Sequence, residues 1–266
     1  MTEINSKNNS KIKDLIKLRD DSKFRNDKSL FYVEGERIIS DSPKELIDSI
    51  YIQKSKLENF KSIINRYNDS QIFLIDDDIF NKIKDTINSQ GIIAVVKYNC
   101  IKNLSNNYLD NIQNCLLLDN INDPGNLGTI IRLAEATNIS LIILCNSCCN
   151  LYNPKVIRSC MSSLFRVNIY ISDDISNDIK FFKNNNFKIY ATVLDNESKH
   201  FNSIYYNSKS VFIFGNEANG ISKSLIDTSD EKIFIPMCGR IQSLNVAIAA
   251  TAICYELMRQ NNYYET

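Results

Sequence analysis

Apolar runs in the second half of the chain constrain its fold more than any other sequence feature. They alternate with segments of helical spacing, and they occupy residues 115–119, 141–145, 188–194 and 211–214. Strands that are apolar throughout are covered on both faces, and their alternation with helices implies a parallel sheet. We therefore expect an α/β fold whose ligands bind in loops beyond the carboxyl ends of the strands.

The first hundred residues have a different pattern. Helical spacing predicts helices over 11–20, 36–50, 56–67 and 77–88, and short apolar runs predict strands over 49–52, 71–75 and 91–96. A compact αβα unit of this size can fold alone. The polar stretch at 102–107 is typical of a linker. The predicted domains are therefore residues 1–108 and 109–266.

The overall charge is balanced, with 31 basic and 31 acidic residues. A net charge of zero argues against a protein that holds nucleic acid by bulk attraction, although local patches remain possible. Basic side chains outnumber acidic ones over residues 7–28. This segment is either a solvated helix face or a phosphate-contacting one.

No stretch of about 18 apolar residues is present to span a bilayer. The N-terminal segment is polar and lacks the apolar core of a secretory signal. We therefore expect a cytoplasmic protein with no membrane partner.

Three of the eight cysteines, Cys145, Cys148 and Cys149, form a C-x-x-C-C cluster. A zinc site would need a second pair of ligands, and the only histidine is His200. We expect ordinary buried thiols at this cluster and no metal site.

A first unusual loop follows the strand that ends at Asp119. A turn of Asp123, Pro124 and Gly125 leads into a helix that Asn126 would cap, and Arg132 lies one to two turns inside that helix. Taken alone, this segment fits a binding loop and a plain helix start equally well.

A second loop, over residues 215–222, leaves the strand at 211–214. Its glycines and asparagines favour bends and positive φ, and the segment after it has helical character instead of forming a hairpin partner. This arrangement favours a binding loop over a simple turn.

A third loop, over residues 236–246, follows the strand at 232–235 and leads into a helix rich in small residues. Ser243 and Asn245 stand where the loop enters that helix, so they can hold polar ligand groups. A capped core helix would explain the helix but not the Pro236-Met237-x-Gly239 sequence.

In this order and at strand ends, the three loops resemble the motifs of the SpoU (TrmH) family of RNA ribose 2′-O-methyltransferases in the SPOUT superfamily. The resemblance spans about residues 114–259. The matching residues are Asn126, Gly128 and Arg132, then Gly215, Glu217 and Gly220, then Ile235, Pro236, Met237, Gly239 and residues 243–246. Ala247 departs from the pattern, since many members carry Ser there, but Ser243 and Asn245 remain.

The resemblance implies a deep trefoil knot in the C-terminal half, a rare exception among protein folds. It also implies S-adenosylmethionine as the cofactor and a homodimer with active sites at the interface. No metal is required for methyl transfer from a sulfonium. The implied cofactor-binding residues are Thr192, Gly215, Asn216, Ile235, Met237, Leu244 and Asn245.

The implied catalytic residues are Arg132, Asn126, Glu217, Ser243 and Asn245. A ribose hydroxyl is too weak an acid to ionise freely, so a group that accepts its proton lowers the barrier. By resemblance that group is Arg132, although its high pKa makes an Arg base chemically awkward. Arg132 therefore either accepts the proton or holds a substrate phosphate.

Residues 31–39, FYVEGERII, resemble an accessory RNA-binding domain similar to ribosomal protein L30e. Family members with this domain mostly act on large-subunit ribosomal RNA. We therefore expect a 23S ribosomal RNA substrate, with transfer RNA as the alternative.

Two further function classes are weaker alternatives. A catalytically silent RNA-binding knot protein would not need the polar residues in all three loops. An NAD enzyme would need a G-x-G-x-x-G turn, which the glycines at 125 and 128 do not form.

Overall fold

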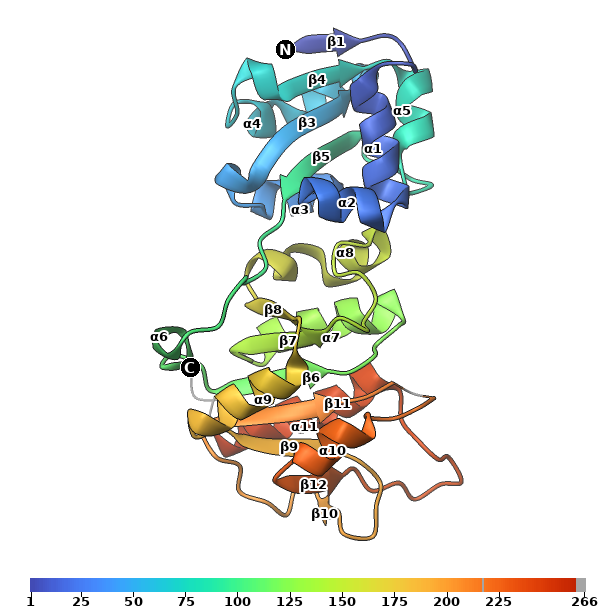
Figure 1. Ribbon diagram of the computed structural model, residues 1–266. Coiled ribbons are helices and arrows are strands. Elements are labelled where there is room, and N and C mark those ends of the chain that lie inside the picture. The colour runs from blue at the N-terminus through green and yellow to red at the C-terminus, as the bar shows by residue number, and fades with distance from the viewer. Residues whose placement is uncertain (217, 262–266) are drawn as a thin grey trace. The chain divides into compact units, whose positions relative to one another are not determined.

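The computed structural model describes residues 1–216 and 218–261, and its backbone divides into two compact units (Figure 1). The N-terminal unit comprises residues 1–99 together with residues 150–165. The C-terminal unit comprises the remaining described residues. One segment from the second half of the chain is thus folded with the first. The functional division after residue 108 remains a prediction.

The N-terminal unit is built on a five-stranded sheet of order β1-β4-β3-β5-β2. Strands β1, β4 and β3 are parallel, whereas β5 runs antiparallel to β3 and β2. The strands are β1 (Thr2–Ile4), β2 (Leu30–Glu34), β3 (Ile47–Gln53), β4 (Ile72–Ile75) and β5 (Ile92–Lys97). The helices are α1 (Ser10–Asp20), α2 (Ser22–Lys28), α3 (Glu36–Asp41), α4 (Lys61–Ile64), α5 (Asp77–Ile83) and α8 (Pro154–Cys160). The 3-10 turns are η1 (Lys44–Leu46), η2 (Lys54–Phe60), η3 (Asp69–Gln71) and η4 (Met161–Phe165).

Three helix predictions for this unit were wrong in detail, and the helix expected over 77–88 ends at Ile83. The helix expected over 36–50 ends at Asp41, because Pro43 cannot continue it and restricts the residue before it. The helix expected over 56–67 is mostly 3-10, with α-helix only at Lys61–Ile64. Strands β1 and β2 were not predicted, although β2 carries the start of the FYVEGERII segment.

Aromatic side chains attach residues 150–165 to the N-terminal sheet. The Tyr152 ring stacks on Tyr98 at 3.7 Å between centroids and lies 4.6 Å from Phe31. Phe165 lies 6.4 Å from Phe31 in a stacked orientation. Phe31 and Tyr152 are fully buried, and each aromatic ring of this kind contributes a large apolar area to a core.

The C-terminal unit contains a seven-stranded sheet of order β10-β12-β9-β11-β6-β7-β8, and every strand pair is parallel. The expected parallel α/β fold is confirmed. The strands are β6 (Asn114–Leu118), β7 (Leu141–Cys145), β8 (Ile169–Ser172), β9 (Lys188–Thr192), β10 (Lys199–His200), β11 (Ser210–Phe214) and β12 (Glu231–Phe234). The helices are α6 (Asn106–Leu109), α7 (Pro124–Ala136), α9 (Ile175–Asn184), α10 (Lys223–Thr228) and α11 (Val246–Gln260).

Helices cover both faces of this sheet, which explains why its central strands are apolar throughout. On one face, Ile179 and Phe182 of α9 and Leu225 of α10 share a core with strand residues such as Leu117 and Ile213. Helices α7 and α11 pack against each other on the other face (Figure 1). No helix of the described residues is both long and apolar enough to cross a membrane.

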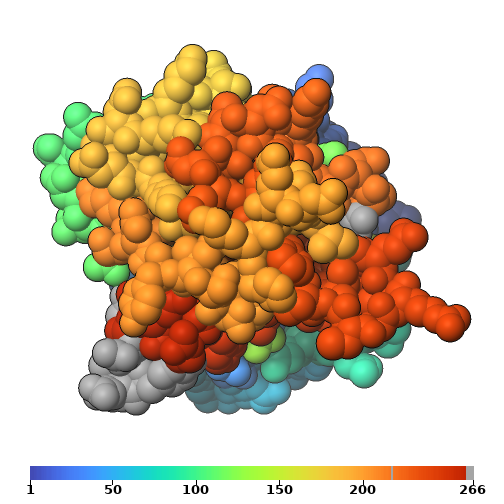
Figure 2. Space-filling view, turned by 90° about the horizontal axis from the view of Figure 1, so that it is seen from below, coloured from blue at the N-terminus to red at the C-terminus, as the bar shows by residue number. Residues whose placement is uncertain are grey.

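The strand order brings the three unusual loops to one edge of the sheet. Strand β11 lies between β6 and β9, and β12 pairs with the far side of β9. Because all of these strands are parallel, the loops that follow β6, β11 and β12 leave from the same edge. Figure 2 shows the orange-red segment between β12 and α11 standing out from this part of the surface.

Candidate active site

A cavity of about 440 Å³ lies at the carboxyl ends of β9, β11 and β12. A volume of this size suits a drug-sized ligand or a cofactor. Its apolar lining includes Phe214, Ile233 and Ile253, which come from two strands and α11. All the predicted cofactor residues except Asn245 line it: Thr192, Gly215, Asn216, Ile235, Met237 and Leu244.

The loop after β11 is closed on itself by backbone hydrogen bonds. The Asn216 N–H donates to the Gly220 carbonyl at 3.2 Å, and the Gly220 N–H donates to the Asn216 carbonyl at 2.8 Å. The Asn216 side-chain oxygen accepts from the Ala218 N–H at 2.8 Å. A Cβ on Gly215 would lie 2.2 Å from the Gly220 carbonyl carbon, so this close approach requires glycine.

Two side-chain contacts join β11 and its loop to neighbouring segments. Asn216 Nδ2 donates to the Asn120 carbonyl at 3.1 Å. Thr192 Oγ1, at the end of β9, donates to the Ile213 carbonyl at 2.7 Å. Backbone hydrogen bonds within the loop and the side chains of Asn216 and Thr192 therefore fix this part of the cavity wall.

Helix α7 begins earlier than expected. Asp123 is its N-cap and accepts from the Asn126 N–H at 2.8 Å, with Pro124 in the first turn. The predicted capping role of Asn126 is therefore wrong, because the Asp-Pro pair is the stronger start signal. The Asn126 side chain instead accepts from Asn245 Nδ2 at 2.9 Å.

This bond brings the first and third motifs together. Asn245 caps α11 by accepting from the Ala247 and Ile248 N–H groups with its side-chain oxygen. Its amide nitrogen is left to reach Asn126 on α7. One side chain thus fixes the start of α11 and its position relative to α7.

The other predicted catalytic residues have different surroundings. Ser243 is exposed and lines the cavity. Arg132 is exposed on α7 and does not line the cavity. Glu217 lies outside the described residues. In the structure, Asn126 therefore contacts Asn245, and Ser243 lines the cavity. Arg132 lies on the surface of the same unit, outside the cavity lining.

Residues 113–255 match the SpoU rRNA Methylase family. This match covers more than half of the chain and all three unusual loops. The chain belongs to the SpoU rRNA methylase family. Residues 9–94 match the MRM3-like substrate binding domain, in the region where an accessory RNA-binding domain was expected.

Relatives of this SpoU methylase extend over both units. The 23S rRNA (guanosine(2553)-2′-O)-methyltransferase RlmP of Bacillus subtilis is 29% identical over 97% of this chain and 99% of its own length. The crystal structure of an AdoMet-bound rRNA methyltransferase from Sinorhizobium meliloti has a TM-score of 0.84 and 25% identity, over 97% of each chain. A Thermus thermophilus tRNA (guanosine(18)-2′-O)-methyltransferase is 31% identical, over 54% of this chain and 74% of its own.

These similarities confirm the enzyme class that the three motifs predicted. The SpoU methylase is an RNA 2′-O-methyltransferase that uses S-adenosylmethionine. The cavity fits this cofactor. Its apolar side chains can contact an adenine, and backbone groups of the loops after β11 and β12 can bind the polar parts of the cofactor.

Sequence reasoning did not single out two acidic residues of the C-terminal unit, Asp119 beside the second loop and Asp195 in the cavity lining. Asp119 is buried and accepts from the Ser222 N–H at 2.7 Å, which joins the end of β6 to the end of the second loop. Asp195 lines the cavity and pairs with Lys232 at 2.8 Å. Hydrogen bonds from the Glu197 backbone and from Lys232 lower the pKa of Asp195. An acidic residue directly after an apolar strand was the available signal for Asp119.

The cysteine cluster supports the loop after β6. The Cys148 sulfur accepts from the Ile121 N–H at 3.4 Å, and the Cys149 N–H donates to the Ile121 carbonyl at 2.9 Å. Burial raises the pKa of Cys148 and of Cys149 to about 11. Within residues 1–216 and 218–261, no group of three or more His, Cys, Asp or Glu side chains is arranged to hold a metal ion.

Proposed function

We propose that this SpoU methylase methylates the ribose 2′-hydroxyl of a nucleotide in 23S ribosomal RNA. The observation that carries the proposal is the similarity to the B. subtilis 23S rRNA enzyme, which extends over nearly the whole of both chains. The similarity to the Thermus tRNA enzyme covers only 54% of this chain. An N-terminal unit that matches a substrate-binding domain therefore favours ribosomal RNA over transfer RNA. A cytoplasmic location is part of the same proposal.

The cofactor-binding residues are proposed from their place in the cavity. S-adenosylmethionine supplies a methyl group that its sulfonium already activates. Backbone groups at Gly215, Ile235 and Met237 would hold the cofactor's polar edges, and Leu244 would contact its adenine. The hydrogen bonds between Asn216 and Gly220 order this wall before the cofactor binds, which lowers the entropic cost of binding. A trefoil knot formed by the last two loops and α11 belongs to the same proposal.

The chemical task of the protein is to place a ribose oxygen in line with the activated methyl group and to help remove its proton. Ser243 lies in the cavity lining, and the Asn126–Asn245 pair lies where α7 meets the start of α11. We propose that these three residues orient the ribose. Arg132 either accepts the proton or holds the adjacent phosphate, and Glu217 remains a proposed orienting residue.

The exposed position of Arg132 supports a homodimer in which a second copy completes the site. Helix α11 presents apolar side chains to solvent, with Ile248 57% exposed and Tyr255 47% exposed. These residues are seven positions apart and therefore lie on one face of the helix. Exposed apolar faces of this kind mark protein interfaces.

Mapping of 2′-O-methylation tests the substrate. Total RNA from cells with and without the gene would be compared at every nucleotide, and the purified protein would be supplied with unmodified 23S rRNA transcript and tritiated S-adenosylmethionine. We expect one ribose methylation in 23S rRNA to disappear with the gene and to be restored in the purified system. A lost methylation found only in transfer RNA would overturn the ribosomal assignment.

A further inference from the structure

A second cavity of about 420 Å³ lies wholly within the N-terminal unit. It is lined by residues of the FYVEGERII segment, by the loop after α5 and by α8, which comes from the second half of the chain. The lining residues used below are Glu34, Arg37, Ile38, Asp85, Pro154, Ile157 and Arg158. No part of the proposed methyl-transfer site contributes to it.

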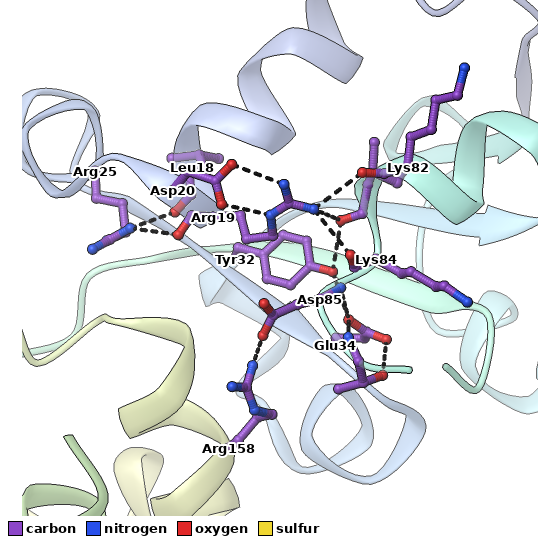
Figure 3. A network of polar contacts seen from close by, with 12 residues as sticks. Leu18, Arg19, Asp20, Arg25, Tyr32, Glu34, Lys82, Lys84, Asp85 and Arg158 are labelled. Carbon is purple, nitrogen blue, oxygen red and sulfur yellow. Dashed lines mark hydrogen bonds and ion pairs between the residues drawn. The ribbon is translucent and has the colours of Figure 1, made fainter. Parts of the chain in front are cut away.

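One wall of this cavity is held by a network of polar contacts (Figure 3). The Glu34 carboxylate accepts from the Tyr32 hydroxyl at 2.9 Å and from the Asp85 and Thr86 N–H groups at 2.7 and 3.2 Å. Arg19 donates to three consecutive carbonyls, of Lys82, Ile83 and Lys84, at 3.0 to 3.2 Å. The loop after α5 is therefore fixed by side chains from α1 and β2.

The acidic side chains of the cavity already have partners within the same network. The acceptor capacity of Glu34 is largely used within the protein, by Tyr32 and the loop backbone. Asp85 forms an ion pair with Arg158 of α8, drawn as a dashed line in Figure 3. Burial is the main cause that raises the pKa of Tyr32, so its hydroxyl stays protonated as a donor to Glu34.

The cationic groups keep donors available. Arg37 is exposed, and no ion pair joins it to an acidic side chain of the described residues. Arg158 uses one guanidinium nitrogen on Asp85, and its side chain is 39% exposed. A guanidinium has five donors and binds phosphate oxygens or the edge and face of a base. The cavity thus offers guanidinium donors on one side.

Apolar side chains form the other part of the lining. Ile38, Pro154 and Ile157 are buried yet line the cavity. Single-stranded RNA is recognised by taking unstacked bases into such surroundings, with arginine on the base plane or on the phosphate. A cavity of about 420 Å³ is large enough for one nucleotide.

We propose that this cavity binds one unpaired nucleotide of the RNA substrate. Arg37 and Arg158 contact its phosphate or base edge, and the base lies against Ile38, Pro154 and Ile157. The proposal rests on the proposed function, because it takes the substrate to be RNA. It adds a recognition site in the N-terminal unit that is built with α8, from the sequence that matches the methylase family.

The first test measures RNA binding by the full-length protein. Binding of unmodified 23S rRNA transcript at fixed salt would be compared for the unsubstituted protein, Arg37→Ala, Arg158→Ala and the control Arg66→Ala. Arg66 is an exposed arginine of the same unit that does not line the cavity. We expect each cavity variant to bind about tenfold more weakly, as loss of one charged hydrogen bond implies. The control should stay within about twofold, and S-adenosylmethionine affinity should not change in any variant.

The second test locates the nucleotide. A transcript containing 4-thiouridine would be cross-linked to the protein, and the modified peptides would be sequenced. We expect cross-links in the segments 31–39 and 154–161, attached to a nucleotide that is unpaired in the RNA. Cross-links confined to other segments would overturn the proposal.

Two outcomes separate this inference from the assignment of the enzyme. If the unsubstituted protein methylates RNA but Arg37→Ala and Arg158→Ala bind it as Arg66→Ala does, only the cavity proposal fails. If the unsubstituted protein methylates no RNA, the proposed function itself fails. Competition by free nucleoside monophosphates at micromolar concentration, with unchanged RNA binding in Arg37→Ala, would assign the cavity to a small effector and overturn the RNA proposal.

Discussion

The two cavities of this protein are built by different means. In the C-terminal cavity, backbone hydrogen bonds between Asn216 and Gly220 and a close backbone approach at Gly215 fix one wall at the ends of parallel strands. The N-terminal cavity depends on side chains, since Arg19, Tyr32 and Glu34 hold the loop that lines it. Backbone walls suit a cofactor that is the same in every turnover, whereas side-chain walls can be changed singly to suit a particular RNA. Substitutions should therefore separate the two functions.

The largest effect should come from Arg132→Ala, because it removes the group proposed to act on the ribose hydroxyl or its phosphate. We expect the rate of methyl transfer to fall by about 10²–10⁴-fold, the range for loss of a general acid or base. S-adenosylmethionine affinity and thermal stability should stay unchanged, since Arg132 is exposed. The assay is tritium transfer to 23S rRNA transcript, with exposed Lys180→Ala as the control. Full activity of Arg132→Ala would exclude Arg132 from the mechanism.

The next effect tests the backbone wall. Gly215→Ala would place a Cβ 2.2 Å from the Gly220 backbone, which cannot move cheaply because the loop is closed on both sides. We expect a loss of S-adenosylmethionine affinity of about 100-fold, which corresponds to about 2.7 kcal/mol. Gly239→Ala is the matched control, since a Cβ there meets nothing within 4 Å. Calorimetric titration measures both variants, and equal affinities would contradict a wall fixed by close backbone approach.

A smaller effect should come from the side-chain wall. Glu34→Ala leaves the Asp85 and Thr86 N–H groups without their acceptor, whereas the Tyr32 hydroxyl keeps the Ile83 carbonyl at 3.3 Å. We expect a loss of about 1–3 kcal/mol in the free energy of unfolding, as for an unsatisfied buried group. The KM for RNA should rise while S-adenosylmethionine affinity stays the same.

Glu36→Ala is a close control for that substitution, because Glu36 belongs to the same segment and, within the described residues, only its backbone N–H forms a hydrogen bond to a side chain, that of Gln90. Chemical denaturation and steady-state kinetics report the two quantities. A matching loss of cofactor affinity in Glu34→Ala would show that the two cavities are not independent.

The smallest expected effect concerns the rate at which the thiols are alkylated. Burial raises the pKa of Cys148 to about 11, so at pH 7.5 its reactive thiolate is scarce, and its alkylation should speed up about tenfold per pH unit until that pKa is reached. The exposed Cys238 should therefore be alkylated by iodoacetamide before Cys148. Mass spectrometry of tryptic peptides measures the order. Faster labelling of Cys148 at pH 7.5 would contradict its supporting role beneath the loop after β6.

Local patterns in the sequence determined much of the C-terminal unit. Apolar runs predicted β6, β7, β9 and β11. A strand that is covered on both faces is apolar at successive positions, so its sequence stands out from that of the loops. The glycine-rich and proline-containing loops were visible because their backbone conformations restrict residue choice. These loops pointed to the enzyme class, and nearly every predicted cofactor residue lines the cavity at the ends of β9, β11 and β12.

Tertiary structure alone decided which distant surfaces meet. The Asn126–Asn245 bond, the Asp119–Ser222 bond and the inclusion of residues 150–165 in the N-terminal unit join positions far apart in the chain. Hydrophobic periodicity reports which face of an element is buried, but not which element buries it. No local motif joins the two arginines of the N-terminal cavity for the same reason, since they lie on α3 and α8 and become neighbours only through packing on β2.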